Sequence, residues 1–270
     1  MEYRIQELKL GGVLDQAISL TKNHFGILFT IMALVYIPAT LVMSFVRQEM
    51  LPPQPAMGAT EAEVAQFWAE YLKAFPVLAV PALITGMILI PLANAAVVDA
   101  VARLYLGKPA SAMDSVKTGI SKILPLLGTS ILVGMAIMGG MFLLIIPGII
   151  FAFWFCLATH VVVIENISGP AALGRSRALM RGNIVTVLVL GIVMLIISAA
   201  IGAVAGFIPQ VHAQLVLQVL LSAVTTIFGT AAMVVFYFSC RCGHENFDLE
   251  HLAQQMGESS SADTSEGDVF

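Results

Sequence analysis

The stretch from Ile123 to Ile164 contains no Asp, Glu, Lys or Arg, and it constrains the fold more than any other feature. A helix needs about 20 apolar residues to cross the hydrocarbon core of a bilayer, and this stretch is long enough for two crossings. Pro147-Gly148 lies near its middle and is a turn signal, so we expect two helices joined there by a tight hairpin. The apolar residues are continuous rather than alternating, which favours helices over a barrel.

Four further apolar segments bring the expected number of membrane helices to about six. The first runs from Phe25 to Val46, where Pro38 would kink the helix without ending it, and the second from Pro76 to Val98. The region from Gly182 to Cys240 is long enough for two more, with a polar interruption at 207–212.

The composition agrees with this count. Hydrophobic residues make up 59% of the chain and charged residues 11%, against about 25% charged in soluble domains. We therefore predict an all-α integral membrane protein, with a polytopic membrane domain at 1–256. The acidic, Ser-rich remainder at 257–270 is predicted to be disordered.

Between the first two spans, aromatic and aliphatic side chains share one helical face. They are Val64, Phe67, Trp68, Tyr71 and Phe75. Aromatic residues gather at the level of the lipid headgroups, so we interpret this segment as a helix lying in the interface. A soluble loop is the alternative.

The positive charges give the orientation. Of the 13 Lys and Arg residues, only Arg47 and Lys73 fall on one side of the predicted layout. Cytoplasmic loops carry the excess of Lys and Arg, so both termini are predicted to be cytoplasmic, in a multi-pass protein of the cytoplasmic membrane. The net charge of −4 gives no reason to expect nucleic acid as a partner.

Three short amphipathic segments, at 13–25, 113–124 and 171–182, each precede a pair of spans. The predicted architecture is therefore three hairpins, each preceded by a cytoplasmic amphipathic helix. Aligning Lys22, Lys122 and Arg181 aligns neighbouring apolar residues too, which suggests a threefold internal repeat. Chance similarity between apolar segments is the rival explanation.

Ionisable and amide groups in or beside a span are candidates for function. Asp99 and Arg103 are spaced to form a pair at a cytoplasmic helix end, either as a structural pair or as an ion site. Asn94 lies about one turn inside and is expected to bond a neighbouring helix.

Two more candidates lie near the end of the fourth span. Glu165 can meet Arg175 or Arg177 across the following loop, and we expect a brace there. His160 has no acidic or thiol neighbour in sequence and is expected near the interface.

The group Cys240-x-Cys242-x-His244 brings metal-capable side chains together, but zinc sites normally use CxxC-type spacing and further ligands. The sequence also lacks a Gly-rich phosphate loop, a GxSxG elbow and an HExxH pair. We therefore predict no catalytic residue, no metal and no cofactor. Gly134, Gly139, Gly140, Gly202 and Gly206 are expected to allow close helix packing.

The second half of the chain resembles the bacterial membrane-domain family named after glycerophosphoryl diester phosphodiesterase. The matching pieces are Ile146-Pro147-Gly148-Ile149, Val161-Val162-Val163-Ile164-Glu165, Ala172-Leu173, Arg175-Ser176, Leu179, Gly182, Tyr237-Phe238, Arg241, Glu245, Phe247-Asp248-Leu249-Glu250 and Leu252-Ala253. The resemblance implies a polytopic membrane domain in which Arg241, Glu245 and Asp248 anchor the last helix. A phosphodiesterase would need a further domain of some 200 residues or more, so the enzymatic part of the family name is not transferred.

These features favour a non-enzymatic membrane protein that organises lipid or scaffolds partners. Its expected partners are membrane lipids, for which anionic lipid is one candidate class, with a second copy or another membrane protein as further candidates. The alternative is a transporter or channel for a small solute, for which Pro38, Pro91 and Asn94 supply some of the usual features.

Overall fold

The computed structural model describes residues 3, 5–52, 55 and 58–245, and these form helices and loops without any strand. Six helices are long and apolar enough to cross a membrane, in the ranges Phe25–Met50, Glu61–Tyr105, Ile123–Leu143, Ile145–Ile164, Ile184–Gly206 and Val211–Glu245. The predictions of an all-helical fold and of six membrane helices are confirmed. The tail predicted at 257–270 lies outside the described residues.

The first half of the chain holds the first two membrane helices and two short helices. Its elements are α1 (Leu10–Asn23), α2 (Phe25–Ile31), η1 (Met32–Tyr36), α3 (Ile37–Met50), α4 (Glu61–Ile84), η2 (Thr85–Leu89), α5 (Ile90–Tyr105) and α6 (Ala112–Ser121). The second half contains α7 (Ile123–Leu143), α8 (Ile145–Phe155), α9 (Ala158–Ile164), α10 (Pro170–Met180), α11 (Ile184–Gly206) and α12 (Val211–Glu245).

The π-helical segments η1 and η2 each lie just before a proline, Pro38 and Pro91. A proline inside an α-helix lacks the N–H that bonds one turn back, and its ring clashes with the carbonyl there. A wider π turn changes the hydrogen-bonding pattern at that point. The first membrane helix therefore continues past Pro38, which confirms the prediction.

The aromatic segment after the first span belongs to the second membrane helix. The structure differs here from the prediction of a separate interfacial helix, since one helix runs from Glu61 to Tyr105. Its start is fixed by a capping box, in which Thr60 and Glu63 satisfy each other's backbone N–H groups. Pro76 and Pro81 lie inside α4 without ending it, as membrane helices tolerate.

The turn between α7 and α8 lies at Leu144, whose backbone is extended, and not at Pro147-Gly148 as predicted. Pro147 falls in the first turn of α8, where its missing N–H costs no helical hydrogen bond. Gly148 instead allows α8 to lie close to α7, because a Cβ on Gly140 of α7 would be only 2.9 Å from the Gly148 Cα. Of the other glycines predicted to allow close packing, Gly134, Gly139, Gly202 and Gly206 face open space.

The buried core lies at one end of the molecule, which we call the base. It consists of α1, α2, α5, α9, α10 and the second half of α12. Nearly all of α5 from Ala93 to Tyr105 is buried, and so is most of α12 from Ala231 to Cys242. The backbone N–H of Leu8 donates to Ser239 Oγ at 2.7 Å, which ties the N-terminal segment to α12.

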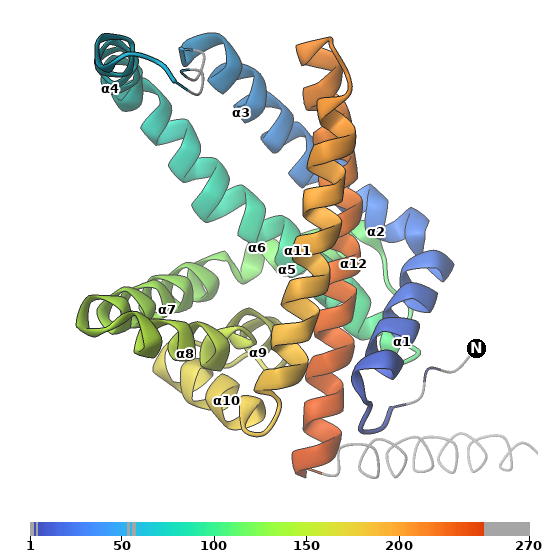
Figure 1. The fold of residues 1–270 in the computed structure, drawn as a ribbon. Coiled ribbons are helices and arrows are strands. Elements are labelled where there is room, and N and C mark those ends of the chain that lie inside the picture. Colours follow the sequence, from blue (N-terminus) through green and yellow to red (C-terminus); the bar gives the residue numbers. More distant parts are fainter. Residues whose placement is uncertain (1–2, 4, 53–54, 56–57, 246–270) are drawn as a thin grey trace, which may run out of the picture.

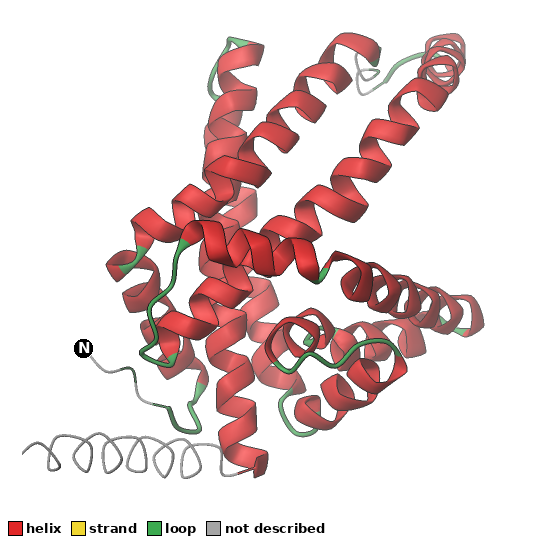
Figure 2. Ribbon diagram, turned by 180° about the vertical axis from the view of Figure 1, so that it is seen from behind, coloured by secondary structure: helices red, strands yellow, loops and turns green. Residues whose placement is uncertain are grey.

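From the base, three pairs of helices project as arms: α3 with α4, α7 with α8, and α11 with the first half of α12 (Figures 1 and 2). Their side chains are largely uncovered by protein. At the tip of the α7–α8 arm, Phe142 is 94% exposed and the residues from Leu143 to Ile146 are all exposed. Because these side chains are apolar, the arms present a surface suited to lipid tails.

The three short helices that precede pairs of spans are α1, α6 and α10. Helix α1 buries Val13, Ala17 and Leu20, the face expected from its pattern. Helix α6 instead buries Ser115, Val116 and Gly119 and leaves Met113 and Ile120 more than half exposed. A Cβ on Gly119 would lie 2.9 Å from the Leu92 carbonyl oxygen, so small residues allow α6 to pack closely on α5. The threefold repeat remains a prediction.

Candidate functional site

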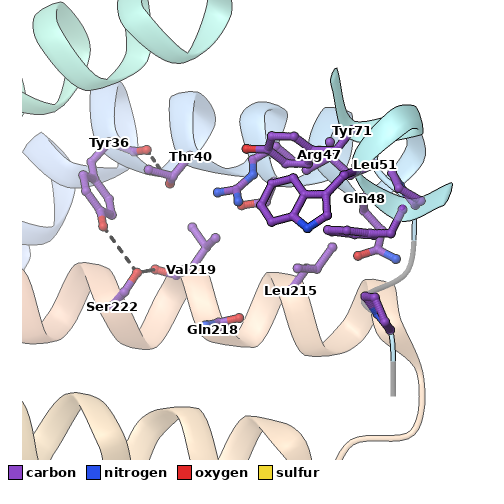
Figure 3. A pocket seen from close by; sticks show the side chains of 15 residues that line it. Tyr36, Thr40, Arg47, Gln48, Leu51, Tyr71, Leu215, Gln218, Val219 and Ser222 are labelled. Carbon is purple, nitrogen blue, oxygen red and sulfur yellow. Dashed lines mark hydrogen bonds between the residues drawn. The ribbon is translucent and has the colours of Figure 1, made fainter. Parts of the chain in front are cut away.

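A groove with a volume of about 1170 Å³ lies between α3, the start of α4 and the first half of α12 (Figure 3). These segments belong to two of the arms (Figure 1). Figure 3 shows Tyr36 and Ser222 at one end of it and Arg47, Gln48 and Tyr71 toward the other. Its lining residues are Tyr36, Thr40, Ser44, Arg47, Gln48, Leu51, Pro52, Pro55, Phe67, Trp68, Tyr71, Leu215, Gln218, Val219 and Ser222.

One wall is a stripe of polar residues along α3. Tyr36, the last residue of η1, and Thr40, Ser44 and Arg47 of α3 are spaced three or four residues apart, so they share one helical face. Thr40 satisfies its own hydroxyl by donating to the Tyr36 carbonyl at 2.7 Å. Apart from Gln48 and Glu49 near its end, the rest of α3 is apolar.

The facing wall is α12, which contributes Leu215, Gln218, Val219 and Ser222 at helical spacing. The hydroxyls of Tyr36 and Ser222 lie 3.5 Å apart and close the inner end of the groove (Figure 3). At 1.5 Å per residue, Gln218 lies about 10 Å and Ser222 about 16 Å from the outer end of α12. Both lie deeper than the first turn of the helix.

The third wall is aromatic and comes from the start of α4. Phe67, Trp68 and Tyr71 contact one another, with ring centroids 5.6 to 6.0 Å apart. Each ring has an apolar body, and Trp68 and Tyr71 also carry a polar group. The predicted aromatic face therefore lines a groove on its own protein, in addition to any contact it makes with the headgroup region.

Arg47 is the only charged residue among those that line the groove. No hydrogen bond or ion pair joins its side chain to another described residue, whereas Arg103, Arg175 and Arg241 all have carboxylate partners. The side chains of Ser44, Gln48 and Gln218 likewise have no partner among the described residues. The groove thus contains a guanidinium and two amides whose hydrogen-bonding capacity is open within that part of the chain.

A second polar cluster lies in the base, where α9, α10 and α12 meet. The Glu165 carboxylate accepts hydrogen bonds from Arg175 at 2.8 to 3.0 Å and from the Tyr237 hydroxyl. Glu245 accepts from Arg175 and, at 3.1 Å, from Arg241. The predicted brace between Glu165 and Arg175 is confirmed, and Tyr237, Arg241 and Glu245 extend it.

The charges in this cluster balance, because two carboxylates alternate with two guanidinium groups. The hydrogen bonds that Arg175 donates to Glu245 above all, and to Glu165, raise the pKa of Arg175 above its ordinary value. The cluster joins three helices and leaves no charge unpaired, so its geometry suits a structural role.

The remaining predicted residues lie elsewhere in the base. Asp99 accepts from Arg103 at 2.9 Å, as its spacing predicts. Arg177 does not reach Glu165; its guanidinium lies 4.1 Å above the Trp154 ring. Asn94 Oδ1 is buried without a partner in the structure, which differs from the predicted hydrogen bond to a neighbouring helix. None of these residues lines the groove.

His160, Cys240 and Cys242 are buried in the base, and Cys156 is half-buried. His160 is 8% exposed, with both ring nitrogens unpartnered among the described residues, and it stacks on Tyr237; its position near the interface stays a prediction. Cys240 and Cys242 are buried in α12, and His244 contacts the Arg181 carbonyl at 3.1 Å. Among the described residues, no group of three or more His, Cys, Asp or Glu side chains is placed to hold a metal ion.

Sequence reasoning identified the aromatic wall but missed the two polar walls of the groove. Ser44, Gln218 and Ser222 each look like a single tolerated polar residue in an apolar span. The available signal was their periodicity, since hydroxyl, amide and guanidinium groups recur along one face of α3.

The fold, with its six apolar helices, is that of a polytopic helical membrane protein with a packed base and arms whose apolar side chains are uncovered by protein. Residues 120–262, more than half of the chain, match a family described as Domain of unknown function (DUF8558), and the chain belongs to this family. The match begins at the end of α6 and includes the Glu165 cluster and the α12 wall of the groove, but not α3 or α4. No curated protein and no solved structure matches the chain.

Proposed function

We propose that this protein is a non-enzymatic component of the cytoplasmic membrane that organises lipid around its arms, with the base and both termini on the cytoplasmic side. The observation that carries the proposal is the contrast between a tightly packed base and arms whose apolar side chains are left uncovered. Such arms offer lipid tails a large contact surface that is held in place from one end.

Helix α6 supports a role at the cytoplasmic leaflet. Its Lys117 side chain is 70% exposed in a solvent-facing pair with Asp114 at 3.7 Å, and the apolar Met113 and Ile120 are more than half exposed on the same helix. A cation above an anionic leaflet contributes about 1 kcal/mol, and apolar side chains that enter the interface add to this. Anionic phospholipid is therefore the proposed partner, and a second copy of the chain or another membrane protein would be an alternative occupant of the arms.

Transport is the alternative function, and the positions of two polar residues count against it. A solute path would be expected to include Asn94 and Asp99, the polar residues of the second span. Asp99 is 9% exposed and paired with Arg103, and the groove is not lined by either residue. The groove residues come from α3, α4, α12 and the segment after α3, so the groove as lined does not reach the base.

The proposed resemblance to the phosphodiesterase-named membrane domains fits the same view. The shared residues Glu165, Arg175, Arg241 and Glu245 form the structural cluster of the base. They brace helices, and nothing in their arrangement calls for a hydrolytic role.

Native mass spectrometry of the full chain tests the proposal. Protein in a mild detergent would be supplied with equal amounts of phosphatidylglycerol and phosphatidylcholine, and bound lipid of each class would be counted. We expect the anionic lipid to be retained preferentially. Lys117→Gln should reduce that preference by roughly fivefold, which corresponds to about 1 kcal/mol per cation.

Lys73→Gln is the matched control, because Lys73 is also an exposed lysine but lies in α4, away from the base. Lys73→Gln should leave the preference for phosphatidylglycerol over phosphatidylcholine unchanged. Equal retention of the two lipids by the unmodified protein, or no bound lipid at all, would contradict the proposed function.

A further inference from the structure

The groove between α3, α4 and α12 has a charge pattern that selects one kind of ligand. Arg47 supplies the only charge among its lining residues, and it is positive. No described carboxylate lies in ion-pair contact with it. An anion in the groove would therefore meet an unpaired guanidinium, which can hold a phosphate through two parallel hydrogen bonds.

The polar groups around Arg47 can form hydrogen bonds with further oxygen atoms of a ligand, so the groove favours an anion that carries an oxygen-rich headgroup. Gln48 is next to Arg47 in α3, Ser44 lies one turn further in, and Gln218 faces them from α12. Their amides and hydroxyl have no partners among the described residues. Arg47 and Gln48 belong to the last turn of α3 and are exposed, so a headgroup can reach them from the membrane surface.

The surroundings of the groove indicate that the ligand also has an apolar part. Leu51, Leu215 and Val219 line it together with the aromatic residues of α4. On α4, Phe75 shares the helical face of Phe67, Trp68 and Tyr71 and is 55% exposed. A ligand with its headgroup at Arg47 can thus place its chains against this apolar and aromatic surface.

We infer that this groove is a binding site for one phospholipid with an anionic headgroup, whose phosphate is held by Arg47 and whose polar headgroup contacts Ser44, Gln48 and Gln218. The inference rests on the proposed lipid-organising function and names a site for it at the opposite end of the molecule from the cytoplasmic base. The ligand comes from the bilayer and not from solution, because Leu51, Leu215, Val219 and the aromatic residues of α4 offer its chains an apolar surface.

Trp68 offers a local reporter of occupancy. The chain contains two tryptophans, Trp68 in the groove and Trp154 at the end of α8, beneath Arg177 of α10. In a Trp154→Phe background, the full chain in detergent would be titrated with phosphatidylglycerol carrying brominated acyl chains, which quench nearby indole fluorescence. We expect saturable quenching at one lipid per chain.

The Arg47→Gln variant should weaken this lipid by roughly tenfold or more, as expected for the loss of a charge-assisted hydrogen bond. Lys73→Gln, which removes the other cation from the same side, is the matched control and should leave the affinity unchanged. Arg47 has no described partner, so its substitution is expected to preserve the fold. A second variant, Ser44→Phe, fills the groove without changing charge and should also abolish saturable quenching.

Three results would overturn the inference. One is quenching by brominated phosphatidylcholine with the same affinity, and another is an affinity unaffected by both Arg47→Gln and Ser44→Phe. The third is displacement of the lipid by millimolar inorganic phosphate, which would identify the site as one for a soluble anion. If Trp68 fluorescence shows no saturable quenching while Lys117-dependent retention of anionic lipid persists, the protein has no lipid site in the groove but can still organise lipid. If neither quenching nor preferential lipid retention is observed, both the lipid site and the proposed function are contradicted.

Discussion

The cluster around Glu165 leads to a quantitative prediction about the stability of the base. Glu165 accepts hydrogen bonds from Arg175 and Tyr237, and its side chain is 11% exposed. Hydrogen bonds to charged groups contribute about 1.5–3 kcal/mol each. Glu165→Gln keeps one acceptor oxygen but places an amide N–H₂ against the guanidinium, so at least one of these bonds is lost.

The size of the effect follows from what Arg175 retains. Removing one partner of a buried pair costs about 3–5 kcal/mol when the other charge is left alone. Arg175 keeps Glu245 as a partner and is 24% exposed, which reduces that cost. We expect Glu165→Gln to lower the free energy of unfolding by about 2–3 kcal/mol.

The assay is a double-mutant cycle of Glu165→Gln with Arg175→Gln, measured by unfolding in mixed micelles with increasing SDS and followed by far-UV circular dichroism. The coupling energy between the two residues should be about 1–2 kcal/mol. Asp99→Asn with Arg103→Gln provides the control cycle, because Arg103 is 46% exposed and the pair should couple by only about 0.5 kcal/mol. Equal coupling in the two cycles would refute the reasoning.

Two further predictions concern packing and orientation. Gly148→Ala should lower the free energy of unfolding by about 1–3 kcal/mol, because a Cβ there would lie 2.8 Å from the Met141 backbone nitrogen. Gly139 faces open space, so Gly139→Ala should leave the free energy of unfolding unchanged. Unfolding of the two variants in SDS micelles measures this difference. Cysteines introduced at the exposed positions Lys73 and Lys108 should react differently with a membrane-impermeant maleimide in intact cells: Lys73→Cys should be labelled and Lys108→Cys protected, and the reverse result would invert the proposed orientation.

The number of membrane helices could be predicted from sequence because hydropathy and helix length are local properties. The spans, the continuation through Pro38 and the break at 207–212 all follow from such patterns. The turn at Leu144 could not be predicted, because Leu144 carries no turn signal. Pro147-Gly148 did carry one, but close contact between α7 and α8 requires Gly148 for a different reason.

The Glu165 cluster and the groove also differ in how far they could be predicted from the sequence. Glu165 and Arg175 are ten residues apart, across a single loop, so their pairing could be predicted. The groove brings Ser44 and Gln218 together from helices distant in the sequence, and each residue alone is unremarkable in its span. Only the packing of α12 on α3 places these polar groups at one site.

The position of α12 has a consequence for the order in which the chain can assemble. This last described helix contacts α1, α2, α3, α5, α10 and α11, and its second half supplies much of the core. During synthesis from the N-terminus, the earlier helices are made before the helix that fastens them. They must therefore wait in the bilayer with their core faces against lipid. A ribosome that stops before Ala231 leaves every arm inserted but the base open, and such a product would be expected to be recognised by quality-control proteases as unfinished.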